Sequence, residues 1–385
     1  MQPTEPNLLQ LLIVPCNALL NPKLRSRYGN HAGFALSSAR PLMLNGLRFV
    51  QMIVLTASFM NFGSSMQLEG NRDEFGEYFK KVRTVQLDPN VVVGQVTHLD
   101  IDAANHLLVT DMMAKGVFIF DAEGKLKKKL SAEPCHPGFN WRPIRAVYSP
   151  NGEIFLINSA PWGFRFKNDG DCLGPVDRSF RPPSHICFQP SGDIVGYYTL
   201  DDGNCLRKLT PLGMEIKKFG VFPDEFKQII SRYDGGGGVI CDLEGKIYQV
   251  DMVSPDILVY NQNGELERKF GRTPPYYQRI SEDLPASSNP MEIIRSFRKI
   301  MQGKTVTTSL YLLGAKTLLI QYMDGVSFGL DILDINGKRV VRKDIRYKNM
   351  IIQAKNGFVY IAVQHEPDKS GNLPNPVIDI YEFRQ

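Results

Sequence analysis

Short apolar segments alternate with polar, glycine-containing clusters along most of the chain. Residues 239–271 show the pattern most clearly, because four β-rich segments are separated there by a cluster at 242–246, a loop, and a second cluster at 261–265. A glycine that follows Asp or Asn in such a cluster is typical of a tight hairpin turn with a positive φ. The segment therefore predicts a unit of four strands joined by two tight turns and one loop.

The same unit recurs along the chain. We take Gly245 as the reference of the first turn and Gly264 as that of the second, and within each copy the two references lie 18 to 22 residues apart. Such regular self-similarity predicts a repeat architecture. First-turn positions in the other copies are Asn105, Gly152, Gly192, Ala315 and Gly357, and second-turn positions are Gly124, Gly170, Gly213 and Gly337.

These copies resemble the repeats of two propeller families. Residues 239–271 look like an NHL repeat, and residues 98–130 are similar, with Asp102, Asp111 and the FDAEGK turn in register. The turns at 149–152 and 189–192 resemble instead the Ser-Pro-Asp-Gly turn of TolB-type repeats. The resemblance covers about residues 96–385 and implies an all-β, six-bladed β-propeller with four-stranded antiparallel blades, but it says little about function.

The strands and the chain ends agree with this architecture. Segments such as 107–109, 117–120 and 154–157 are apolar on successive residues, which suits blades buried on both faces. The sixth copy ends after the strand 377–383, without a fourth strand, whereas an unassigned strand at 78–87 precedes the first copy. We therefore expect this N-terminal strand to complete the last blade and close the ring.

The first 65 residues do not fit a blade. Residues 1–42 are predicted to be an extension outside the fold. In residues 43–65, Arg48 precedes an apolar run, which is followed by small residues at a spacing typical of a signal-peptide cleavage site. This order is typical of a secretory signal peptide, so we expect a mature chain that begins near Met66. A buried helix or strand and an uncleaved membrane anchor are the alternatives. The propeller is assigned to residues 66–385, and the protein is predicted to be exported to the periplasm or the extracellular space, with membrane association through residues 43–65 left open.

Charge and cysteine content change this picture little. The 45 basic and 40 acidic residues give a net charge of +5, too balanced to indicate a nucleic-acid partner. The lysines at 125–129 and at 80–81 are expected on outer strands, where lysine protects exposed edges. Five cysteines follow residue 65, without short paired spacings, so no zinc or other metal site is predicted and the cofactor stays unknown. Cys187 and Cys241 lie in expected innermost strands and are interpreted as small buried side chains.

The two faces of the predicted ring differ. Both glycine turns of every copy belong to one face, which we call the glycine-turn face. The opposite, loop-rich face carries the long connections 131–143, 220–237 and 272–306. The last of these contains a predicted helix at 289–301, capped by Asn289, with Met291, Ile294, Phe297 and Met301 at helical spacing. This helix is expected either to cover the axial opening as a lid or to fill a gap between blades.

Polar side chains are expected at the axis on the loop-rich face. His98, Arg145 and His185 occupy equivalent positions at the start of the innermost strand in three consecutive copies, and Asp111 and Asp251 end second strands near the same rim. Such side chains can bind an anion, polarise a carbonyl group or, with the aspartates, hold a metal. The alternative is that they simply line a wet channel.

These observations favour an exported binding or scaffold protein that recognises a peptide, glycan or protein partner on its loop-rich face. The alternative is a propeller enzyme of the lactonase or lyase type with a His/Arg or metal site at the axis. The metal-binding Glu/Asn/Asp set of lactonase-like propellers has no residue-by-residue match in this sequence. An intracellular NHL-type RNA or protein binder is disfavoured by the signal-like segment and the modest net charge.

Overall fold

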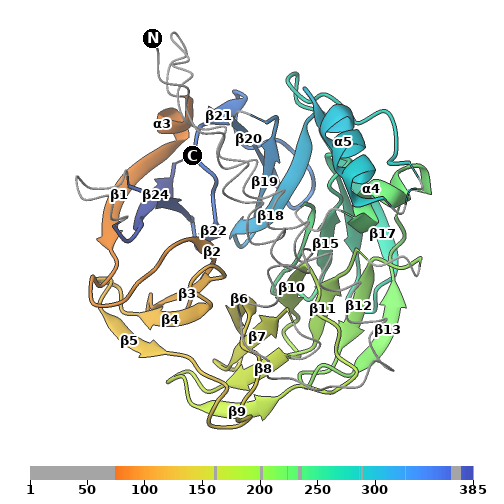
Figure 1. Cartoon of the computed structure of the whole chain (residues 1–385). Helices are drawn as coiled ribbons and strands as arrows, with labels where there is room; N and C mark the ends of the chain where they lie inside the picture. The colour runs from red at the N-terminus through yellow and green to blue at the C-terminus, as the bar shows by residue number, and fades with distance from the viewer. Residues whose placement is uncertain are drawn as a thin grey trace, which may run out of the picture. The chain divides into compact units, whose positions relative to one another are not determined.

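Six four-stranded antiparallel sheets follow one another around a ring (Figure 1). The computed structural model describes residues 74–159, 163–199, 203–222, 224–232, 236–285, 287, 289–325, 327–365 and 374–384. The predicted extension at 1–42 and the signal or anchor segment at 43–65 lie outside these residues. The prediction of an all-β, six-bladed propeller is confirmed.

Blades one to three each run outward from the axis in chain order. The first blade comprises β2 (Val96–Ile101), β3 (Leu107–Asp111), β4 (Gly116–Phe120) and β5 (Leu126–Lys129). The second comprises β6 (Pro143–Tyr148), β7 (Ile154–Asn158), β8 (Gly163–Phe166) and β9 (Cys172–Pro175). The third comprises β10 (His185–Phe188), β11 (Ile194–Tyr197), β12 (Leu206–Leu209) and β13 (Glu215–Phe219).

Blades four to six continue the ring. The fourth comprises β14 (Gly238–Cys241), β15 (Ile247–Val250), β16 (Asp256–Tyr260) and β17 (Leu266–Gly271). The fifth comprises β18 (Val306–Gly314), β19 (Thr317–Met323), β20 (Phe328–Asp334) and β21 (Ile345–Tyr347). The sixth comprises β22 (Gln353–Lys355), β23 (Phe358–Val363), β24 (Val377–Phe383) and the N-terminal strand β1 (Phe79–Gln86).

Strand β1 forms the outer edge of the sixth blade. It pairs antiparallel with β24, from Phe79 opposite Phe383 to Gln86 opposite Val377. The residues of β1 between Phe79 and Val85 are exposed, whereas these two side chains are buried. Helix α3 (Glu74–Tyr78) precedes β1 and buries Phe75, whose ring stacks on that of Phe79 at 4.5 Å. Chain segments from the two ends of the propeller therefore share one sheet.

Local sequence explains the blades. Every residue of β3, β4 and β7 is buried, as expected for strands covered on both faces. Gly245 and Gly264 have φ values of 82° and 77°, and a Cβ atom on Gly264 would lie within 2.9 Å of the Phe219 ring. In the fifth blade the chain turns between Gly314 and Thr317, which pair with each other, so the turn at Ala315 is made without a glycine at the reference position.

The helices on the loop-rich side pack together beside the fourth blade (Figure 1). The predicted helix is α5 (Pro290–Met301), and the Asn289 side chain accepts a hydrogen bond from the Met291 amide at 3.0 Å. Its buried face is formed by Ile293, Phe297 and Ile300, whereas Met291 is 57% exposed. These three side chains join one hydrophobic cluster with Ile229 and Ile230 of α4 (Lys227–Arg232), which follows the short 3-10 helix η3 (Asp224–Phe226). Helix α5 thus fills space against the blades through this apolar face.

Two disulfides correct the interpretation of the cysteines. Cys187 of β10 and Cys241 of β14 are bonded, with their Cα atoms 5.6 Å apart, and Cys135 is bonded to Cys172 of β9, with a Cα separation of 6.1 Å. The interpretation of Cys187 and Cys241 as simple buried side chains is wrong, because the innermost strands of the third and fourth blades are neighbours and bring these distant positions together. Among the described cysteines, Cys205 takes no part in these two disulfides, and its side chain is buried.

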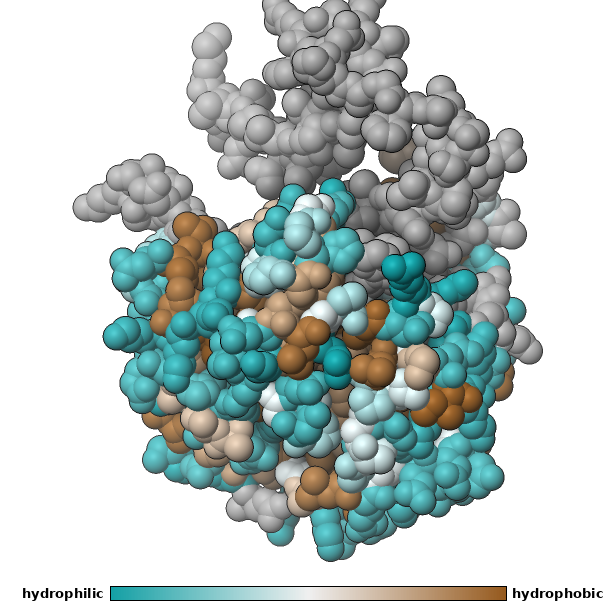
Figure 2. Space-filling model, turned by 90° about the horizontal axis from the view of Figure 1, so that it is seen from below, coloured by the Kyte–Doolittle hydropathy of each residue, from teal (hydrophilic) through white to brown (hydrophobic). Residues whose placement is uncertain are grey.

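The outer edges of the blades are largely polar. The three lysines of β5 are exposed, and Lys128 forms an ion pair with Asp171 of the next blade at 3.2 Å. Figure 2 shows the rim of the ring, where hydrophilic side chains dominate and hydrophobic ones form separate small patches. Across the described residues, no helix is both long and apolar enough to cross a membrane.

Candidate functional site

Three of the predicted site residues meet at the axis on the loop-rich face. His98, Arg145 and His185 lie near the starts of β2, β6 and β10, which are the innermost strands of three consecutive blades. The guanidinium of Arg145 places Nη1 2.9 Å from Nδ1 of His185. Because arginine can only donate, Nδ1 of His185 accepts this bond and the proton of the neutral ring lies on Nε2. We call these three residues the axial cluster.

The electrostatics of the axial cluster keep both imidazoles neutral. Burial is the main cause that holds the pKa of His98 and of His185 well below the usual value, and the charge of Arg145 is the second. A buried ring beside a fixed cation resists protonation because the charged form loses water and meets a like charge. Nδ1 of His98 is buried and has no hydrogen-bond partner among the described residues. The cluster therefore combines one permanent positive charge with two neutral rings.

Residues from two further blades lie within electrostatic range of the axial cluster. The charge of Lys355, in β22, also lowers the pKa of His98. Burial raises the pKa of Tyr311, in β18, to about 12, although Arg145 opposes this shift. The Tyr311 hydroxyl donates a hydrogen bond to the Ile351 carbonyl at 2.8 Å. Lys355 itself is ion-paired with Asp100 at 3.1 Å, and the His98 ring is hydrogen-bonded to the backbone of Ala146. The groups of the cluster that suit an anion or a strongly polarised oxygen are therefore the guanidinium of Arg145 and the Nε2–H group of His185.

Asp111 is placed inside the first blade rather than open to the axis. Its side chain is 0% exposed, and its carboxylate accepts hydrogen bonds from the amides of Gly94, Gln95 and Ala114. The first two amides belong to the segment that leads into β2, the strand that carries His98. Asp111 therefore holds the backbone segment that leads into β2 in place, and its carboxylate oxygens are occupied by these hydrogen bonds.

Asp251 lies between the third and fourth blades. It is 5% exposed and accepts hydrogen bonds from the Tyr197 hydroxyl at 3.4 Å and from Nε2 of Gln249 at 2.5 Å. Burial raises the pKa of Asp251 to about 7, even though both hydrogen bonds favour the ionised form. The Tyr260 hydroxyl extends this hydrogen-bond network by donating to Oε1 of Gln249 at 3.1 Å. Asp251 is thus a buried carboxyl group that holds its proton up to near-neutral pH.

We expect Asp251 to make stability depend on pH. Its pKa is about 7 in the folded protein and 3.8 in an unfolded chain, so between these values the folded state holds the extra proton. Asp251 therefore gives the free energy of unfolding a downward slope between pH 4 and 7, worth at most about 4 kcal/mol, whereas the depressed pKa values of His98 and His185 act in the opposite direction. The contribution of Asp251 is the difference in slope between the parent and a variant that cannot ionise at this position. Asp251→Asn cannot ionise and should lose this slope and exceed the parent in stability at pH 8, as measured by urea unfolding.

Asp169→Asn is the matched control for this experiment, since Asp169 is an exposed aspartate in a turn of the second blade. It should keep the slope of the parent. An Asp251→Asn variant with an unchanged slope would show that another group causes the pH dependence.

The described residues show no group of three or more His, Cys, Asp or Glu side chains that could hold a metal ion. Asp111 and Asp251 are bonded within their own surroundings. The chemistry that the axial cluster offers through its own side chains is therefore hydrogen-bond donation and positive charge from Arg145 and His185, and a basic ring nitrogen, Nδ1 of His98.

The fold and the axial cluster define a six-bladed β-propeller with a cationic axial end, and solved structures agree with this fold. The sequence matches no protein-family model and no curated protein. A member of the DUF4221 family from Bacteroides vulgatus has a TM-score of 0.60 and 11% identity, and the match covers 80% of this chain and 98% of that one. A protein from Bacteroides fragilis that is predicted to be exported has a TM-score of 0.57 and 12% identity, with coverage of 80% and 94%.

A virginiamycin B lyase from Staphylococcus aureus also matches, with a TM-score of 0.44, 12% identity and coverage of 75% of this chain and 80% of that one. At such low identities the two Bacteroides structures show the fold alone, and nothing is inferred from the lyase. The resemblance to NHL or TolB-type repeats in particular stays a prediction.

Proposed function

We propose that this protein is an exported binding or scaffold protein that recognises a peptide, glycan or protein partner on its loop-rich face. The observation that carries the proposal is the meeting of His98, Arg145 and His185 from three blades, with Arg145 bonded to His185 at 2.9 Å. Strands of three blades hold these side chains, and binding sites are commonly built from side chains positioned by such a rigid scaffold.

The axial cluster is suited to an acidic or strongly polar group of the partner. Arg145 supplies a permanent charge, and His185 carries its proton on Nε2 because Nδ1 accepts from Arg145. His98 adds a second ring whose Nδ1 has no bond to the described residues. A carboxylate of a peptide or of an acidic sugar could accept hydrogen bonds from Arg145 and from Nε2 of His185, and charge-assisted bonds of this kind are the stronger ones. Nδ1 of His98 carries a lone pair and could accept a bond from a hydroxyl or amide group of the same partner.

Three observations support export. The described residues contain two disulfides, and stable disulfides are typical of oxidising compartments outside the cytosol. The sequence at 43–65 has the order of a signal peptide. One solved structure with a similar fold is that of a Bacteroides fragilis protein predicted to be exported. Together they favour a location in the periplasm or the extracellular space. In the alternative form of this proposal, residues 43–65 stay uncleaved and anchor the exported protein to the membrane.

Replacing the axial cluster tests the proposal. A ligand would first be identified by screening the purified propeller on peptide and glycan arrays, and its affinity measured by calorimetry. The triple variant His98→Ala, Arg145→Ala and His185→Ala should bind this ligand at least about 100-fold more weakly, since the loss of charged hydrogen bonds costs about 1.5–3 kcal/mol each. Its melting temperature should stay within a few degrees of the parent.

A control variant removes positive charge from the outer edge of the sixth blade instead. Lys80→Ala with Arg83→Ala changes two exposed residues of β1 and should leave the affinity unchanged. If this control weakens binding as much as the triple variant does, general charge explains the effect. If the triple variant binds like the parent, the axial cluster is only the lining of a wet channel.

His98 also keeps an enzymatic function open as the second candidate. A neutral imidazole with an unbonded, buried Nδ1 close to a fixed cation can act as a general base beside a group that stabilises negative charge. This arrangement suits a lyase or lactonase type of reaction. A compound that His98→Gln binds but does not convert, while the parent converts it, would favour the enzyme over the binding protein.

A further inference from the structure

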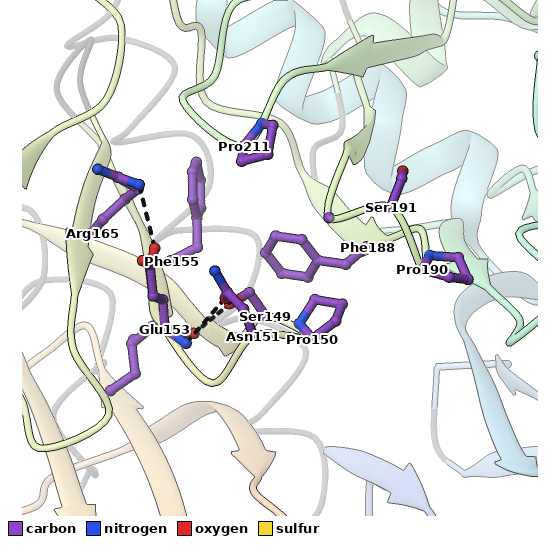
Figure 3. Close-up of a pocket in the computed structure, with 12 residues that line it drawn as sticks. Ser149, Pro150, Asn151, Glu153, Phe155, Arg165, Phe188, Pro190, Ser191 and Pro211 are labelled. Atoms are coloured by element: carbon purple, nitrogen blue, oxygen red, sulfur yellow. Dashed lines mark hydrogen bonds and ion pairs between the residues drawn. The ribbon is translucent and has the colours of Figure 1, made fainter.

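A separate cavity lies between the second and third blades on the glycine-turn face (Figure 3). It has a volume of about 270 Å³ and is bounded by the turn that follows β6, the turn that follows β10 and Pro211. Arg145 and His185 join the same two strands near their other ends. The cavity is therefore distinct from the axial cluster, although both lie along one boundary between blades.

The walls of this cavity are mainly rings. Phe155 and Phe188 meet edge to face, with centroids 6.2 Å apart, and Pro150, Pro190 and Pro211 surround them. Phe155 is 2% exposed and belongs to the core between the two blades, whereas Phe188 is half-buried. In Figure 3 the rings of Phe155 and Phe188 and that of Pro211 border the same space. The interior thus offers a rigid, apolar surface.

The polar groups of the cavity are few and balanced. Nη1 of Arg165 lies 3.3 Å from Oε2 of Glu153, so a strong donor and a strong acceptor stand side by side at one edge. Ser149 donates to the Glu153 carbonyl at 2.9 Å, and Oδ1 of Asn151 accepts from the Glu153 amide at 3.3 Å. Some of the polar groups of this turn are therefore already hydrogen-bonded within the turn, and the edge of the cavity carries one positive and one negative charge.

Two exposed apolar residues belong to the same turn as Pro211. Pro211 is followed by Leu212 and Met214, which are each 45% exposed. The Leu212 carbonyl accepts a hydrogen bond from the Asp177 amide at 2.8 Å, so this turn is tied to the segment that follows β9. A pocket lined by rings, with exposed apolar residues beside it, has the character of the central anchor site of a protein interface.

We propose that this cavity docks an uncharged segment of a partner protein, which inserts one aromatic side chain against Phe188. The cavity is smaller than the roughly 300–1,000 Å³ of drug-sized ligand sites, but it has room for a single large side chain. The pair Arg165 and Glu153 matches a peptide group, whose carbonyl accepts and whose amide donates. A free carboxylate on the inserted residue would meet the negative charge of Glu153, and a sugar would find few unengaged polar groups on walls made of Phe and Pro.

The experiment uses the full propeller and N-acetylphenylalaninamide as the probe, with saturation-transfer NMR as the readout. N-acetylalaninamide is the control compound, because it has the same peptide groups without the ring. Ser191→Trp fills the mouth of the cavity from an exposed position, and Phe188→Ala removes the main wall. Glu244→Trp is the matched control, since Glu244 is exposed and stands before Gly245 as Ser191 stands before Gly192.

We expect a signal for the aromatic probe in the parent and in Glu244→Trp, and a decrease of at least about fivefold in both Ser191→Trp and Phe188→Ala. The triple variant of the axial cluster should keep the full signal, so this proposal and the proposed function can fail separately. An equal signal in Ser191→Trp, or no signal in the parent at 10 mM probe, would overturn the proposal. Methyl glucoside binding that Ser191→Trp abolishes would overturn it too, because it would assign the cavity to a glycan.

Discussion

A protein that lacks residues 74–86 is expected to lose cooperative folding. Strand β1 pairs with β24 along its whole length, and Phe75, Phe79 and Val85 are each at most 2% exposed. Losing the burial of three such side chains against the propeller costs about 5–8 kcal/mol, before the loss of the ladder hydrogen bonds, and typical domains have only about 5–15 kcal/mol of stability. Thermal unfolding followed by circular dichroism should show a transition lowered by more than about 15 °C or no transition.

The control for this truncation keeps the strand and changes only its charge. Lys80→Thr with Arg83→Thr alters two exposed positions of β1 and should change stability by no more than about 0.5 kcal/mol per site. A truncated protein that melts at the temperature of the parent would show that the ring does not depend on β1.

Reduction of the two disulfides is the second change that we expect to lower the stability of the protein strongly. The bonds span 37 and 54 residues, for which loop-closure entropy predicts about 4 kcal/mol each. The Cys187–Cys241 bond joins the innermost strands of neighbouring blades, so its loss also frees the boundary between the third and fourth blades. We expect dithiothreitol to lower the guanidinium midpoint of the parent substantially, as measured by tyrosine and tryptophan fluorescence.

A variant with serine at Cys135, Cys172, Cys187 and Cys241 separates the bonds from other effects of the reductant. It should be less stable than the oxidised parent and should not respond to dithiothreitol. A parent whose midpoint is the same with and without reductant would contradict the assignment of these bonds.

The architecture could be predicted because its determinants are local. A glycine with positive φ, as at Gly245 and Gly264, forces a tight turn within four or five residues. Continuous apolar runs mark strands that are covered on both faces, as in β3 and β7. Each copy repeats these signals, so the repeat is still recognised when one turn lacks the glycine, as at Ala315.

The site could be predicted only as far as equivalent positions in the repeats allow. His98, Arg145 and His185 stand at the same place in three copies, and the structure brings them together. Lys355 and Tyr311 were missed. Lys355 reaches the first blade because the closed ring makes the sixth blade its neighbour, and the approach of Tyr311 to Arg145 depends on how the fifth and second blades face each other across the axis. The disulfides were missed for a related reason, since Cys187 and Cys241 become neighbours only when the blades are stacked.

Asp111 and Asp251 show a different limit. The position in the repeat places both residues at the ends of second strands. It does not show whether the carboxylate points towards the central axis or is buried within and between the blades. Backbone amides within reach decide this for Asp111, and the hydroxyl of Tyr197, from the neighbouring blade, contributes for Asp251. Neither set of partners has a recognisable sequence pattern.

The pairing of β1 with β24 also sets the order in which the ring can be completed. The pairs of this ladder join residues that are almost 300 positions apart, such as Thr84 and Asp379. During synthesis β1 emerges first and has no partner strand until the chain is nearly finished, and contacts of such high sequence separation form slowly. An unpaired strand edge invites association with other chains. We therefore expect the lysines and the arginine of β1, which are exposed at the outer edge of the finished blade, to oppose association with other chains during synthesis as well, before β24 is available.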